Sequence, residues 1–112
     1  MKTAERFLLE LIEMNAIVRE RYLTLCSLIP EIEDDGVRKD VQKLLEYVDS
    51  LSMQLDVSIT EMQSFIRLRT LKEEKELEYS FLNDHQNLNR FIYLLLRLLA
   101  QIANLIGINQ DD

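Results

Sequence analysis

The sequence predicts an all-α protein, an up-and-down antiparallel helical bundle with coiled-coil-like packing. Two observations lead to this fold class. Apolar residues recur at intervals of three and four, and the 112 residues include only two glycines and one proline, far below the roughly 12% of these two types in average proteins. The elements must therefore be long. The chain length and a hydrophobic content of 47% suit one domain, residues 1–112, with one core.

The first helix is expected over residues 4–29, with Thr3 as its N-cap. Asn15 occupies a position in its apolar seam, where it either fixes the pairing register or points at solvent or a backbone carbonyl. Apolar residues outside the seam, such as Ile17, widen the surface and predict contact with two neighbours. The seam residues share a four-three spacing: Ala4, Leu8, Leu11, Val18, Tyr22, Leu25 and Ile29.

Pro30 ends the first helix, and the polar run 31–36 makes the first connection. Its acidic residues have the spacing that begins a calcium-binding loop. Gln42, however, stands where the closing bidentate glutamate is required. An acidic turn followed by an Asp34 or Asp35 helix cap is therefore expected.

The middle of the chain allows two architectures. A seam that resumes at Val37 slips by one residue between Leu55 and Ile59, and Ser58 with Glu61 forms a capping-box pair. These features predict two helices, 36–56 and 58–80, and a four-helix bundle. The alternative is one long middle helix and three helices in all. The four-helix form is preferred because short connections favour antiparallel neighbours.

The last helix is expected over residues 84–106, after a polar connection at 83–89, and Gly107 is expected to end it and leave 107–112 as a tail. It is the most apolar segment, and its wide apolar surface predicts burial on most sides. A membrane span is disfavoured, because Arg97 near its middle would cost roughly 2.5 to 3.5 kcal/mol. The polar residues fall on one narrow stripe: Arg90, Arg97, Gln101 and Asn104.

Few residues could carry chemistry. His85 is the single histidine and is expected in solvent near a helix cap, whereas Cys26, the single cysteine, is expected as a small buried hydrophobe in a reduced compartment. No phosphate loop or nucleophile elbow occurs in the sequence, so neither an enzyme nor a cofactor or metal is predicted. The net charge of −7 opposes nucleic-acid binding. The basic cluster from Arg67 to Lys75 is interleaved with glutamates, which cancel its field.

These observations predict a small acidic protein–protein interaction module with an adaptor, assembly or regulatory role, acting as a homodimer. A cytoplasmic location is expected, because acidic residues interrupt the N-terminal apolar run before a signal-peptide core forms. Candidate interaction residues are Asn15, Tyr22, Phe81, Leu95 and Arg97. Tyr47 and Tyr79 are further aromatic residues expected at the surface.

Two other functions remain open at this stage. A metal- or ligand-binding bundle would use carboxylates on facing helices, namely Glu10, Glu13, Glu46 or Asp49. An inhibitor that mimics nucleic acid would use the negative surface, for which a net charge of −7 is modest.

Overall fold

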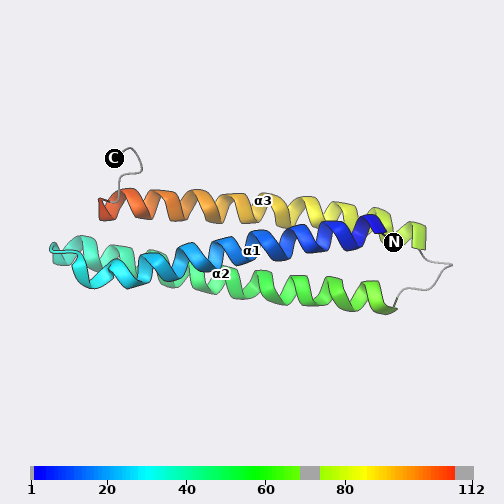
Figure 1. Ribbon diagram of the computed structural model, residues 1–112, viewed down its shortest axis with the longest axis horizontal. Helices are drawn as coiled ribbons and strands as arrows, with labels where there is room; N and C mark the ends of the chain where they lie inside the picture. Colours follow the sequence, from blue (N-terminus) through cyan, green and yellow to red (C-terminus); the bar gives the residue numbers. More distant parts are fainter. Residues whose placement is uncertain (1, 69–73, 108–112) are drawn as a thin grey trace.

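Three long helices and one short 3-10 turn make up the fold. The computed structural model describes the backbone of residues 2–68 and 74–107 and the side chains of residues 5–64, 66–67 and 83–107. The elements are α1 (Lys2–Leu28), η1 (Ile29–Glu31), α2 (Asp35–Leu68) and α3 (Glu74–Ile106). Successive helices run in opposite directions, so α1 and α3 run in the same direction (Figure 1). α1 packs against both other helices more extensively than these two pack against each other.

The molecule is a rod rather than a sphere. Its principal extents are 60 × 26 × 17 Å, and its radius of gyration of 17.3 Å exceeds the value of about 13 Å expected for a compact chain of this length. A rod leaves a large share of each helix at the surface. The three helices therefore share one narrow core along the long axis.

The all-helical class is confirmed, but the preferred four-helix layout is not what the chain forms. Residues 56–58, expected as a break, lie inside α2, and residues 83–89, expected as a polar connection, lie inside α3. No glycine or proline occurs between Gly36 and Gly107, so neither place contains a residue type that ends helices. The number of long helices matches the alternative with one long middle helix.

The buried seam residues of α2 keep an unbroken three-four spacing, and those of α3 keep it from Ile92 onward. In α2 the slip expected near residue 56 does not occur, because Leu45 and Ser52 occupy the seam in place of Leu44 and Leu51. His85 occupies a seam position of α3 in the same way, so its expected place in solvent was wrong. Interlocking of the kind found in coiled coils stays a prediction. The buried seam residues are Val41, Leu45, Val48, Ser52, Leu55, Ile59 and Met62 of α2, and His85, Ile92, Leu95, Leu99 and Ile102 of α3.

Short-range signals mark three helix ends as expected, whereas Thr3, expected as an N-cap, lies inside α1. The Asp34 carboxylate accepts a hydrogen bond of 3.0 Å from the Val37 backbone N–H, which makes Asp34 the N-cap of α2. Pro30 lies at the start of η1, where its missing N–H leaves no bond unmade. Gly107 follows α3 with φ of 91°, a left-handed conformation that glycine adopts without strain.

The most apolar helix is covered on one face only. The sequence predicted burial of α3 on most sides, yet Tyr93, Leu94 and Leu105 are each more than half exposed. Only 22% of its most apolar 18-residue window is buried, because two neighbouring helices cover less than half of its circumference. α3 therefore presents to solvent an apolar surface of the kind that usually meets another molecule.

Candidate functional site

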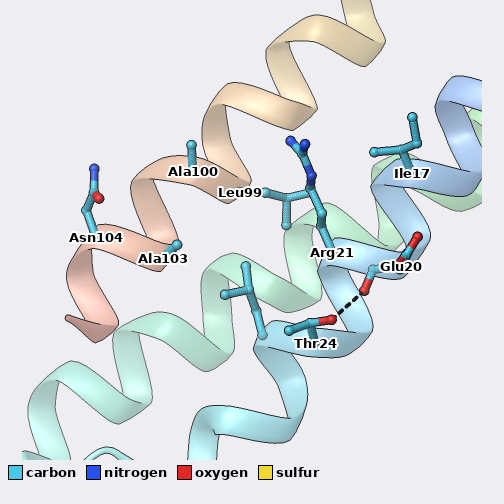
Figure 2. Close-up of a pocket in the computed structure, with 9 residues that line it drawn as sticks. Ile17, Glu20, Arg21, Thr24, Leu99, Ala100, Ala103 and Asn104 are labelled. Atoms are coloured by element: carbon cyan, nitrogen blue, oxygen red, sulfur yellow. Dashed lines mark hydrogen bonds between the residues drawn. The ribbon is translucent and has the colours of Figure 1, made fainter. Parts of the chain in front are cut away.

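A surface groove lies between α1 and α3 near the C-terminal end of α3. Its volume is about 770 Å³. Figure 2 shows Ile17 and Arg21 of α1 on one side, and Leu99, Ala100 and Ala103 of α3 on the other. The full set of residues that line the groove is Ile17, Glu20, Arg21, Thr24, Leu25, Leu99, Ala100, Ala103 and Asn104.

The groove exists because α3 carries two small residues there. Ala100 and Ala103 lie toward α1, and a methyl group is too short to fill the space between two helices. Leu25, Leu99 and Ala103 are buried and form an apolar floor. Such a floor, open to solvent, suits an apolar side chain from another molecule rather than a charged ligand.

The rim of the groove is polar and exposed. Glu20, Arg21, Thr24 and Asn104 are exposed to solvent. The Thr24 hydroxyl donates a hydrogen bond of 3.0 Å to the Glu20 backbone carbonyl within α1 (Figure 2). An apolar floor inside a polar rim is the usual anatomy of a protein-docking surface.

A polar layer links α1 to α2 on the other side of α1. The Asn15 amide donates a hydrogen bond to the Asp56 carboxylate, and the hydroxyl of Ser52 donates one of 3.4 Å to the amide oxygen of Asn15. Asn15 therefore pairs two helices of the same chain, in line with its expected role in helix pairing, and its place in a partner interface stays a prediction. Arg19 donates a hydrogen bond of 2.6 Å to Asp49 in the same interface, which raises the pKa of the Arg19 guanidinium.

Tyr22 belongs to this polar layer and is half-buried, not exposed. The guanidinium carbon of Arg19 lies 5.4 Å from its ring centroid, a cation–π contact. A hydrogen bond with the Cys26 thiol, followed by burial, raises the pKa of Tyr22 to about 12. Cys26 is half-buried rather than fully buried. Both side chains serve the α1–α2 interface.

His85 lies in the α1–α3 interface with no hydrogen bond to its ring. Its ring stacks on that of Phe7, with centroids 4.3 Å apart, and Nε2 is 3.8 Å from the Glu10 carboxylate. Among the described residues, none is placed to hydrogen-bond either ring nitrogen or the buried Oδ1 of Asn89 one turn later. Burial lowers the pKa of His85, and the nearby Glu10 carboxylate opposes this effect.

The candidate interaction residues fall in different places. Leu95 is 2% exposed and belongs to the core, so it has no surface to offer a partner. Arg97 is exposed on the outer face of α3, as expected. Asn15 and Tyr22 face α2, and the side chain of Phe81, like that of Tyr79, lies outside those described. Tyr47 is exposed as expected.

Sequence reasoning missed the groove residues Arg21, Ala100 and Ala103. The only signal was the pair of alanines three residues apart in an otherwise bulky helix, which places them on one face. Which neighbour that face meets is a property of the packing.

The carboxylates considered for a metal site do not come together. Asp49 is paired with Arg19, and Glu10 lies near His85. Across residues 5–64, 66–67 and 83–107, no group of three or more His, Cys, Asp or Glu side chains has the arrangement needed to hold a metal ion.

One segment has the length and composition of a membrane span. Asn83–Ile106 has a mean hydropathy of 1.2 over its best window, a test that the core helices of soluble proteins also pass. Arg90, Arg97, Gln101 and Asn104 are exposed along its outer stripe. In a membrane these polar side chains would point away from the other two helices and into the lipid, and burying them in hydrocarbon is costly.

No protein-family model, curated protein or solved structure matches this chain.

Proposed function

We propose that the chain is a protein–protein interaction module without catalytic activity, and that it docks through the face formed by α1 and α3. The observation that carries the proposal is the uncovered apolar surface of α3 beside the groove. Ile17, Tyr93 and Ala100 are exposed apolar residues of this face, and charged residues such as Arg21 and Arg97 flank them. Docking would cover apolar surface that the three helices of one chain leave in water.

The accessible surface supports association. The chain exposes 7993 Å², whereas a compact monomer of 13.3 kDa exposes about 6,450 Å². The excess of about 1,500 Å² is larger than the roughly 800 Å² that each partner contributes to a standard interface. Association along one face of the rod would remove this excess without any change of fold.

The polar stripe of α3 favours a protein over a membrane as the occupant. Arg97 and Asn104 are exposed beside the apolar residues of this face. A protein surface can supply acceptors for these groups, whereas hydrocarbon cannot. His85 is buried against Phe7, so its imidazole is not open to a substrate in this fold.

A photo-cross-linking amino acid placed at residue 17 tests the proposal in cells that express the chain. Leu23 is the matched control, because it is an apolar, exposed residue of the same helix on a different face. We expect protein adducts at residue 17 and about tenfold fewer at residue 23, since cross-linking requires contact within the reach of one side chain. Equal labelling at the two positions, or no protein adduct at residue 17, would contradict the proposal.

A further inference from the structure

The α1–α3 face has a measurable register between its two helices. The ring of Phe7 stacks on that of His85, which sets an offset of 78 residues (85 − 7) between the two helices at this contact. Because α1 and α3 run in the same direction (Figure 1), Ile17 lies level with Leu95 by the same offset.

Side chains of opposite character are placed symmetrically about this level. On α1, Glu13 lies one turn before Ile17 and Arg21 one turn after it, and both are exposed. On α3, Tyr93 precedes the level of Leu95 by two residues and Arg97 follows it by two, and both are again exposed. Residues four apart on a helix share a face. The face therefore carries Glu13 and Tyr93 on one side of its centre, and Arg21 and Arg97, together with Glu20 of the groove rim, on the other.

We infer that the occupant of this face is a second copy of the chain, docked antiparallel about a two-fold axis at the level of Ile17. The inference rests on the proposed function and names its partner. A two-fold interface must be self-complementary, since each patch meets its own copy. About an axis at residue 17, Glu13 meets Arg21 of the second copy, and about the same axis Tyr93 meets Arg97.

Each of these pairings occurs twice in the dimer. The Glu13–Arg21 pair is electrostatically complementary, and the guanidinium of Arg97 over the ring of Tyr93 is a favourable cation–π contact. Ile17 is 42% exposed in the single chain and meets its own copy at the centre, next to the groove floor. The centre of the interface is thus apolar and its flanks are charged, the arrangement found in stable interfaces.

The groove lies within the area that the second copy covers. In the proposed dimer, Tyr93 of the second copy is level with Arg97, beyond the Ile17 end of the groove. Because the face includes the groove and the outer surface of two helices, it can supply the roughly 800 Å² per chain that a standard dimer requires.

Disulfide trapping tests the position of the axis in the full chain. In a Cys26→Ser background, Ile17→Cys places one thiol of each copy at the two-fold axis. A disulfide requires a separation of about 4.4 to 6.8 Å between the two Cα atoms, which residues at the axis can meet. We expect mild oxidation to give a covalent species of twice the 13.3 kDa chain mass. Leu23→Cys, at the more exposed control position of the same helix, should form this species about tenfold more slowly.

Charge exchange tests the pairing. Glu13→Arg and Arg21→Glu should each weaken self-association about tenfold in sedimentation equilibrium, because each change replaces two attractions with two repulsions. The double variant Glu13→Arg/Arg21→Glu should recover the affinity of the natural chain, which a merely destabilising change could not do. Circular dichroism checks that all three variants remain folded, as expected for exposed positions.

The possible failures separate the two proposals. A chain that stays at 13.3 kDa at micromolar concentration, while residue 17 cross-links to a different protein, overturns the second copy and retains the interaction function. A monomer with no adduct at residue 17 overturns both. A dimer that Leu23→Cys traps as fast as Ile17→Cys, or that the double charge exchange fails to restore, overturns the two-fold arrangement.

Discussion

His85 gives a prediction that can be worked out from its surroundings. Its side chain is buried and its ring nitrogens have no hydrogen-bond partner among the described residues, a condition that costs about 1 to 3 kcal/mol for each unsatisfied group. His85→Leu removes this cost and keeps an apolar residue in the seam. It also removes the stacking on Phe7, which contributes about 0.5 to 1.5 kcal/mol. At the lower limit the two nitrogens cost about 2 kcal/mol together, so after the loss of stacking we expect a net stabilisation of about 1 kcal/mol at pH 7.5.

The pKa of His85 also sets an expected pH dependence of the stability. Burial holds the pKa of His85 in the folded chain below its ordinary value of 6.5. The unfolded chain therefore binds a proton more readily than the folded chain. The free energy of unfolding is independent of this group above pH 6.5 and decreases as the pH falls through 6.5 toward the folded pKa. His85→Leu should remove this acid-sensitive part, and the advantage of the variant should grow between pH 7.5 and pH 5.5.

Urea unfolding monitored by circular dichroism at pH 7.5, 6.5 and 5.5 measures both effects. For a chain of 112 residues, 1 kcal/mol corresponds to about 4 °C in melting temperature. Asn89→Leu is the matched control, because it removes a buried unsatisfied oxygen one turn away that does not titrate. It should stabilise without changing the pH dependence. A loss of stability in His85→Leu, or an unaltered acid response, would refute the account of an unsatisfied imidazole.

Three other substitutions test the packing. Asn15→Ala should lower the free energy of unfolding in urea by about 1 to 3 kcal/mol, because it leaves the buried Ser52 hydroxyl without its partner. The double variant Asn15→Leu/Ser52→Val should be nearly neutral, and equal losses in both variants would argue against the pairing. Asp34→Ala should lower stability by about 1 kcal/mol through loss of the N-cap bond, with no loss expected from Asp34→Ser. Arg97→Leu should change stability by less than about 0.5 kcal/mol, because Arg97 is exposed; if this variant unfolds, the arginine is a paired buried charge.

The sequence by itself determined the features that depend on neighbours along the chain. Asp34, Pro30 and Gly107 act through bonds and dihedral angles within a few residues, so their roles as helix ends could be predicted. The all-helical class also follows from local spacing and from the scarcity of glycine and proline. The outer position of Arg97 was predictable for the same reason, because it lies on a polar stripe of one helix.

The register of the core was decided by the tertiary structure. In α2, Leu51 and Ser52 compete for one position of the seam, and hydropathy alone favours the leucine. Ser52 is nevertheless buried, because Asn15 across the interface accepts its hydrogen bond. With Leu44 and Leu51 placed in the seam, the three-four spacing slips by one residue between Leu55 and Ile59. That apparent slip led to the prediction of a fourth helix.

Long-range contacts also decided the place of His85 and the location of the groove. His85 stands in a polar run of the sequence, yet Phe7 from a helix 78 residues away covers its ring. Ala100 and Ala103 form a groove only because α1 lies beside them. The free energy of burying a side chain depends on what packs against it, and that neighbour is set by the course of the whole chain rather than by adjacent residues.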